Sequence, residues 1–158
     1  MPPGLTVALS GDDTFQYTSG SISAVASTLA NQDPGHVTFP NEIATVEQGK
    51  NGGVIYSENR MGFIADFTGR FILGAIDDTN LNSLQNQQIS GFSGFGLITA
   101  VYTKRVGNGA GVISSVIYQL SGGIFTKGVE AKTSARGDVE QSVAVWMIRF
   151  GSWVRLIQ

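Results

Sequence analysis

The segment that most constrains the fold is the run from Val139 to Phe150, VEQSVAVWMIRF, which contains no Gly or Pro. β-Branched and aromatic residues dominate this run, and such residues favour an extended strand over a helix. At roughly 3.3 Å per residue, a strand of this length extends for about 40 Å, which is long for a small domain. The run therefore predicts a β-rich chain.

Other segments share this β-type pattern and are separated by turn residues. Gly96–Thr103 and Gly111–Leu120 are predicted to be long strands, and the Asn-Gly step within Lys104–Ala110 favours a hairpin turn between them. Residues 20–35 are rich in Ser and Ala, and we expect a loop or an arm there. Shorter strands are predicted at Leu5–Ser10, Phe15–Ser19, His36–Phe39, Ala44–Gln48, Val54–Ser57, Gly62–Phe67, Arg70–Leu73, Gly123–Lys127 and Val129–Thr133.

One segment departs from the strand pattern. It begins with Asp77 and Asp78, which favour a helix N-terminus, and it continues with Leu81, Leu84 and Ile89, which are compatible with one apolar stripe. We predict a short helix over about 78–87, packed on a sheet. No internal repeat or Pro-rich linker divides the 158 residues. We therefore expect a single domain, 1–158, of mainly β class: a β-sandwich or barrel-like fold with one flanking helix.

Charge is scarce and unevenly distributed along the chain. Only 14% of the residues are charged, against roughly 25% in an average globular domain. Residues 1–49 contain five acids and no Lys or Arg, whereas all ten basic residues follow. This asymmetry has two interpretations: chance together with a solvated acidic face, or a molecule with an acidic and a basic end that stacks head to tail.

The predicted strands lack a clear polar face. In Gly111–Leu120, Val112, Val116 and Tyr118 fall on one side and Ile113 and Ile117 on the other. Apolar residues on both sides indicate either a central buried strand or a surface covered by neighbouring subunits. Because few charged residues are available to coat a monomer, we favour self-association.

No arrangement of residues points to catalysis, a cofactor or a metal. The chain has no Cys and one His, so it lacks the side chains of a zinc cluster or a thiol enzyme. The Gly-rich segments match neither a phosphate loop nor a nucleophile elbow. The start of the chain has no basic region followed by an apolar core, and no apolar run reaches about 20 residues. We therefore predict no enzyme activity, no cofactor, no standard secretion signal and no membrane anchor.

Residues 44–150 contain a characteristic order of segments. It consists of the Gly-rich hairpin Lys50–Ser57, the strand pair Met61–Asp66 and Gly69–Leu73, the helix at Asp77–Leu84, the hairpin of two long strands, and the closing segment of Gly122–Gly128, a turn around Arg136–Asp138 and Val139–Trp146. This order resembles that of the tail tube (inner tube) proteins of contractile-tailed bacteriophages. It is more remotely similar to the tube subunits of R-type pyocins and other contractile injection systems.

The resemblance implies a structural virion protein. In such a protein, subunits form hexameric rings that stack into a tube inside a contractile sheath, and the inner strands close into one barrel around a lumen that conducts DNA without binding it specifically. The implied partners are further copies of the chain and the sheath, tail terminator and baseplate proteins. The implied location is the virion tail, assembled in the bacterial host cytoplasm.

Two groups of residues are the candidates for contacts between subunits. The resemblance implies that the hairpin tip reaches the adjacent ring, and charge complementarity adds the only adjacent basic pair, Lys104 and Arg105, which we expect in a solvated turn. The alternatives are another virion ring protein (tail terminator, baseplate ring or decoration protein) and a carbohydrate-binding β-sandwich with Trp146 or Trp153 as its platform. The residues of the hairpin tip are Gly49, Lys50, Asn51, Gly52 and Gly53.

Overall fold

The structure is a computed structural model that describes residues 7–8, 13–20, 22–30, 34–107, 109–136 and 139–158. Within these residues it contains one α-helix, α1 (Ile76–Ser90), and two short 3-10 helices, η1 (Arg60–Phe63) and η2 (Phe92–Gly94). The predicted mainly β class with a single helix is confirmed. The strands are β1 (Val7–Ala8), β2 (Thr14–Ser19), β3 (Ile22–Val25), β4 (Gly35–Thr38), β5 (Ala44–Gln48), β6 (Val54–Glu58), β7 (Ala65–Ile72), β8 (Ile98–Gly107), β9 (Ile113–Phe125), β10 (Glu130–Arg136) and β11 (Val139–Ile157).

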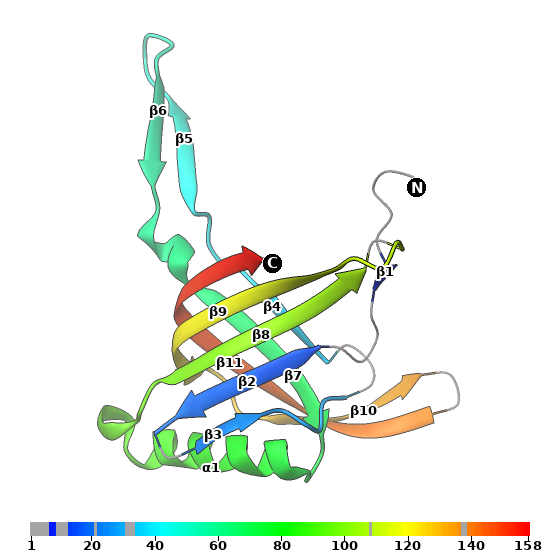
Figure 1. The fold of residues 1–158 in the computed structure, drawn as a ribbon. Coiled ribbons are helices and arrows are strands. Elements are labelled where there is room, and N and C mark those ends of the chain that lie inside the picture. The colour runs from blue at the N-terminus through cyan, green and yellow to red at the C-terminus, as the bar shows by residue number, and fades with distance from the viewer. Residues whose placement is uncertain (1–6, 9–12, 21, 31–33, 108, 137–138) are drawn as a thin grey trace.

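Strand β11 organises the main sheet, whose strand order is β3-β2-β8-β9-β11-β7-β4 (Figure 1). One edge of β11 pairs with β7 over residues 143–150. The opposite edge pairs with β10 over residues 139–145 and with β9 over residues 148–157. The 19 residues of β11 therefore pair with strands on both sides, β7 on one and β9 and β10 on the other. Such extensive pairing agrees with the strong strand signal of this segment in the sequence.

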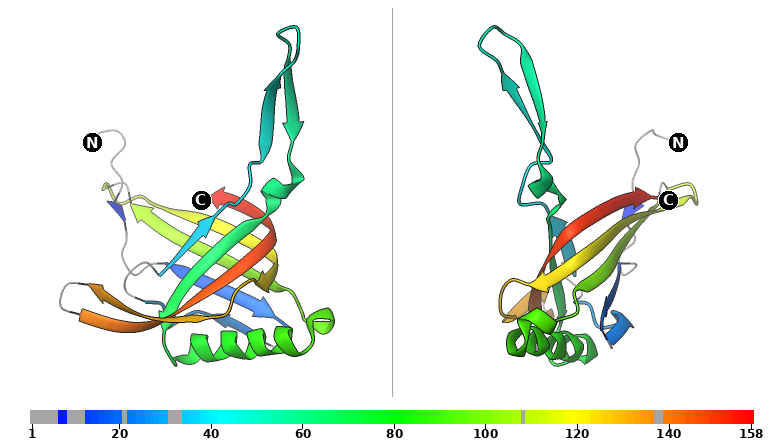
Figure 2. Two further views of the ribbon diagram at one scale, coloured as in Figure 1. Left: turned by 180° about the vertical axis from the view of Figure 1, so that it is seen from behind. Right: turned by 90° about the vertical axis from the view of Figure 1, so that its left-hand side faces the viewer.

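The sheet wraps around an aromatic core. After β3 the chain crosses to β7, where Leu29 forms a bridge with Phe71 and the Ile72 amide donates to the Thr28 carbonyl at 2.8 Å. This crossing joins the two ends of the strand order into a barrel-like wall. Inside the wall the Phe15 and Phe67 rings stack at 4.4 Å. Helix α1 lies across one end of the barrel, as two further views show (Figure 2), with Leu81 and Leu84 fully buried.

Two predicted strand breaks are wrong, because a glycine inside a strand makes room for an aromatic ring. In the structure, η1 is followed by one strand, β7, where the sequence predicted two strands. The predicted strands were Gly62–Phe67 and Arg70–Leu73, or Met61–Asp66 and Gly69–Leu73 in the segment order that carries the resemblance. A Cβ at Gly69 would lie 2.8 Å from the rings of Phe67 and Phe71. Likewise β9 runs through Gly123 to Phe125, so the predicted strand Gly123–Lys127 is not separate.

Four other elements differ from the prediction, and two of them, β8 and β11, are strands that pairing with neighbours extends. β8 continues to Gly107, so Lys104 and Arg105 lie in a strand and not in a turn. β11 continues through Trp153 to Ile157, and residues 20–35, expected as a loop or arm, contain β3. Helix α1 is longer than the predicted 78–87. Asn108, Gly137, Asp138 and all of Leu5–Ser10 except Val7 and Ala8 lie outside the described residues.

Replacing Gly123 by Ala is expected to destabilise the fold by about 1–3 kcal/mol, the usual cost of overpacking a core. The new methyl group would lie 2.5 Å from the Phe150 ring and 3.0 Å from the backbone oxygen of Ile98. Gly128→Ala is the matched control, because nothing lies within 4 Å of its added Cβ. Urea unfolding measures both variants, and equal stabilities would contradict this account of Gly123.

Candidate assembly surfaces

A two-stranded hairpin projects from the end of the barrel opposite α1 and forms a small sheet of its own (Figure 1). β5 and β6 pair from Ala44 with Glu58 to Gln48 with Val54. Val46 is 65% exposed, and Tyr56, directly opposite it, is 77% exposed. Val54 is two residues from Tyr56 and so lies on the same side of the hairpin. We call residues 44–58 the arm and the side that carries Val46, Val54 and Tyr56 its apolar face.

The arm is held at its base by hydrogen bonds and has no core of its own. The Asn59 amide donates to the Ile43 carbonyl at 3.0 Å, which closes the neck of the arm. The Asn59 side chain accepts from the Met61 amide at 3.1 Å and so caps η1. Trp153 of β11 donates its Nε1–H to the Gly62 carbonyl at 2.9 Å. These contacts tie the direction of the arm to the barrel wall.

The outer side of β3, β2, β8, β9 and the last part of β11 is a second notable surface, and we call three rows of its residues the uncharged sheet face. These fourteen residues alternate with core residues along each strand and none is charged, whereas the next outward position of β8 after Thr103 is the exposed Arg105. One row across the five strands is Val25, Gln16, Val101, Gln119 and Val154. A second row is Ser23, Thr18 and Thr99, continued by Ser121 and Ser152, and a third is Thr14, Thr103, Ile117 and Leu156.

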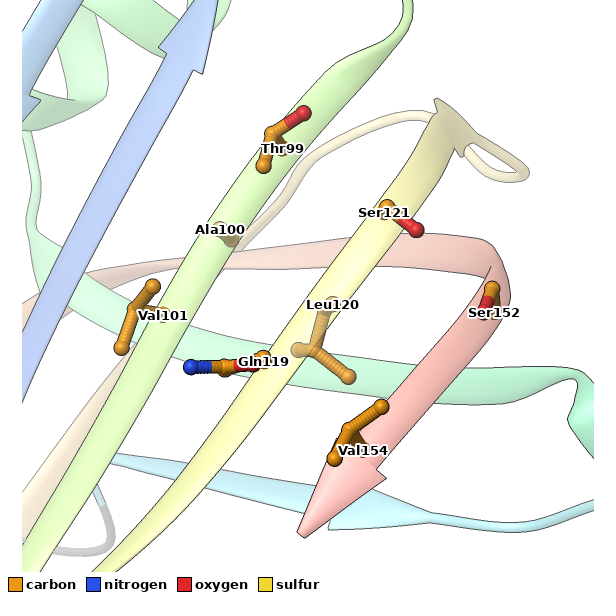
Figure 3. Close-up of a pocket in the computed structure, with 8 residues that line it drawn as sticks. All are labelled: Thr99, Ala100, Val101, Gln119, Leu120, Ser121, Ser152 and Val154. Carbon is orange, nitrogen blue, oxygen red and sulfur yellow. The ribbon is translucent and has the colours of Figure 1, made fainter. Parts of the chain in front are cut away.

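A shallow hollow of about 310 Å³ lies between β8, β9 and β11 (Figure 3). Its polar lining comes from hydroxyl groups, such as those of Thr99 and Ser121, and from the Gln119 amide. None of the lining residues has an acid, a base or an activated nucleophile, so the hollow has no group for proton transfer or covalent catalysis. The lining residues are Thr99, Ala100, Val101, Gln119, Leu120, Ser121, Ser152 and Val154.

The two acids at the start of α1 have a structural role. Asp77 is buried and accepts hydrogen bonds from the Tyr17 hydroxyl at 2.9 Å, from the backbone amides of Ser27 and Thr28, and from the Thr28 hydroxyl. Asp78 accepts from Trp146 Nε1–H at 2.9 Å and from the Gly74 amide at 2.9 Å. Both carboxylates therefore join the N-terminus of α1 to the barrel. The sequence predicted that this acid pair lies at a helix start but not these contacts.

Ionisation of the Tyr17 hydroxyl makes the fold less stable as the pH rises in the alkaline range. Burial raises its pKa from 10.0 to about 12; a hydrogen bond from Asn80 opposes this increase, and the hydrogen bond and charge of Asp77 add to it. The unfolded chain therefore releases this proton at lower pH than the folded chain, so stability falls as the pH rises from about 10 to 12. Tyr17→Phe should lose less stability than the unchanged chain over this interval, as measured by urea unfolding. An identical pH dependence in both chains would contradict the assignment.

The structure separates the two groups of predicted contact residues. Gly49–Gly53 forms the tip of the arm, whereas Lys104 and Arg105 lie near the end of β8, away from that tip (Figure 1). Lys104 Nζ is 3.7 Å from Asp13 Oδ2, so at least one acid of the first 49 residues pairs with a cation from the rest of the chain. Asp12 and Asp33 lie outside the described residues. The uneven charge along the sequence therefore does not become a simple division into two charged ends.

Comparison with known families leaves the chain without an assignment. No protein-family model matches it, and no curated protein matches it either.

Among the described residues, no three His, Asp or Glu side chains come together as a metal site would require. The helices of the described part of the chain include none that is both long and apolar enough to cross a membrane. The arm and the uncharged sheet face are thus the features on which a functional proposal rests.

Proposed function

We propose that this protein is a structural subunit that assembles with copies of itself into stacked rings, as the tail tube of a contractile-tailed bacteriophage. The observation that carries the proposal is the arm. An isolated two-stranded hairpin is marginally stable at best in water. The arm nevertheless has Val46, Val54, Ile55 and Tyr56 more than half exposed. A partner that covers these side chains supplies the burial that the single chain does not.

Two strand edges support closure of the subunits into a ring. Within the described residues, no strand pairs with the outer edge of β3, and none pairs with residues 151–157 of β11 on the side away from β9. These edges bound the uncharged sheet face on its two sides. Pairing β3 of one subunit with β11 of the next satisfies both edges and closes the sheets into a continuous barrel.

The uncharged sheet face is suited to line the lumen of such a barrel. Proteins hold DNA mainly through Lys and Arg contacts with phosphates. The hydroxyl, amide and aliphatic groups of its fourteen residues offer no such contacts, and the exposed Arg105 lies at one margin of the face, next to Thr103 on the same side of β8. In the proposed function DNA passes along this face without being retained, and the subunit contributes a smooth conduit and no chemistry. The sheath, tail terminator and baseplate proteins are the further partners in this proposal.

The alternatives differ in measurable ways. A tail terminator or baseplate ring occurs once per particle, whereas a tube protein occurs in many stacked rings, so the number of copies per purified particle separates them. A carbohydrate-binding β-sandwich needs exposed aromatic platforms. Trp146 is fully buried, and the partly buried Trp153 lies 4.6 Å from the Phe39 ring, so neither indole favours that alternative.

Tyr56→Glu is expected to prevent the stacking of rings, because it places a carboxylate on the apolar face of the arm. The fold should be unchanged, since Tyr56 is 77% exposed and contributes nothing to the core. Ser57→Glu is the matched control: it adds the same charge to the next residue of β6, on the opposite side of the arm. Sedimentation velocity should show stacked assemblies for the unchanged chain and for Ser57→Glu, and nothing larger than a single ring for Tyr56→Glu. Stacked assemblies of Tyr56→Glu at the same protein concentration would contradict the role given to the arm.

A further inference from the structure

A second group of exposed apolar side chains lies at the end of the barrel that α1 covers. Ile89 is 76% exposed at the end of α1, Phe92 is 65% exposed in η2, and Leu97 is 58% exposed just before β8. η2 follows the end of α1 directly and β8 begins at Ile98, so the three residues lie within nine consecutive positions of the chain. We call them the helix-end patch. Exposed side chains of this size, close together, are typical of an interaction surface.

The composition around the patch also indicates a covered surface. No charged residue occurs in the 25 positions from Thr79 to Thr103, although most of α1 in this interval is exposed. The exposed side of α1 carries amides and a hydroxyl, including Asn82, Ser83 and Asn86, where a solvated helix normally carries charged residues. Depletion of charge is the compositional mark of the centre of a protein interface. The side of α1 next to the patch is therefore suited to contact another protein.

The positions of the two apolar surfaces determine how they can meet. The arm leaves one end of the barrel and α1 lies across the other end, in all three views (Figures 1 and 2). The apolar face of the arm therefore cannot reach the helix-end patch of its own chain. Two copies stacked in the same orientation bring the arm of one to the patch of the next. Such a head-to-tail contact uses two different surfaces and repeats without closing, which produces a filament.

We propose that the apolar face of the arm of one copy docks on the helix-end patch of the copy in the next ring. This inference rests on the proposed function and names the surface that receives the arm. A five-residue strand spans about 16 Å, so the arm extends well beyond the barrel that carries it. The arm spans only residues 44–58, fewer than the roughly 20–30 residues a side that are typical of a stable pair. The contact therefore holds rings together by repetition around the ring, and isolated head-to-tail dimers do not accumulate.

Cross-linking tests the docking directly, because the chain has no native Cys. Gln48→Cys lies on the apolar-face side of the arm, opposite Val54, and Ser90→Cys is an exposed position beside Ile89. A short bis-maleimide should convert assembled double-variant chains into a covalent ladder longer than dimers. Each single variant should give dimers at most. The control is the double variant Gln48→Cys with Gln119→Cys. Position 119 lies on the uncharged sheet face, so this control should give no ladder.

A charge placed in the patch gives an independent readout. Ile89→Glu should raise the protein concentration needed for half-maximal assembly at least tenfold, whereas Gln87→Glu, on the opposite flank of α1, should change it little. Both residues are exposed, so the thermal unfolding of the monomer should not change.

The outcomes distinguish this inference from the proposed function. Tubes that cross-link through Gln119, or through neither pair, would overturn the docking site and leave the tube role standing. Chains that form neither ladders nor tubes under any condition would overturn both.

Discussion

A chain in which residues 44–58 are replaced by two glycines is expected to fold normally and to lose the stacking of rings into tubes completely. The arm contributes no side chain to the buried core, and it forms a sheet of its own. Its ends are already close together, since the Asn59 amide donates to the Ile43 carbonyl at 3.0 Å. A short linker should therefore join Ile43 to Asn59 without distorting η1 or β7.

Circular dichroism and thermal unfolding of this armless chain should match those of the full chain in its monomeric state. Electron microscopy of the concentrated armless protein should show no tubes. Single rings without stacking would agree with the proposal, because ring closure uses the edges of β3 and β11 and not the arm. Stacked tubes formed by the armless chain would show that the arm is dispensable and would contradict the proposal.

Asp77→Ala is expected to cause the largest loss of stability among single substitutions of polar residues in this fold. It removes the acceptor of the Tyr17 hydroxyl and of two backbone amides at the crossing from β3 to β7. A buried donor left without a partner costs about 1–3 kcal/mol, and the two backbone amides are only partly buried. Asn80 donates to the Tyr17 oxygen and therefore does not replace the acceptor that the Tyr17 O–H loses. We expect a total loss of about 3–5 kcal/mol in the free energy of unfolding.

Asp66→Ala is the matched control for Asp77→Ala. Asp66 forms a two-point ion pair with Arg149, at 2.7 and 3.0 Å, on the exposed side of the sheet. Exposed ion pairs contribute about 0–1 kcal/mol, so this variant should remain close to the unchanged chain in urea unfolding at neutral pH. Similar losses for the two variants would contradict the distinction between a buried acceptor and a surface ion pair.

Local patterns in the sequence predicted most of the individual elements. The acid pair Asp77-Asp78 marked the start of α1 because the helix dipole favours carboxylates at a helix N-terminus. In the structure, however, both carboxylates accept hydrogen bonds from groups outside α1 and not from its own amides. The Gly-rich segment between Ala44–Gln48 and Val54–Ser57 correctly marked the tip of a hairpin. Alternation and turn residues are local signals, and these features depend on local interactions.

The wrong boundaries have a common physical origin in tertiary packing. Gly69 and Gly123 resemble strand breaks, but the structure needs them inside strands because neighbouring Phe rings occupy the space of a side chain. β9 and β11 are longer than predicted because they pair with each other although β10 lies between them in the sequence. β8 is longer because its pairing with the next strand, β9, continues to Gly107. β3 was missed because Ser and Ala give no strand signal until pairing with β2 is known.

The candidate surfaces were only partly predictable for the same reason. The arm tip was located by its glycines, and the alternation of Val54 and Tyr56 beside that tip was the available signal for the apolar face. The pair Lys104-Arg105 was misplaced because a dipeptide does not reveal that Lys104 lies near Asp13. The uncharged sheet face combines residues from five strands and exists only in the folded register.

Cryo-electron microscopy of the concentrated protein tests the central claim most directly. The proposal predicts tubes of stacked rings, with the uncharged sheet face lining a central channel and each arm in contact with the next ring. A particle that remains monomeric at all concentrations and salt conditions, whether recombinant or recovered from virions, would contradict it.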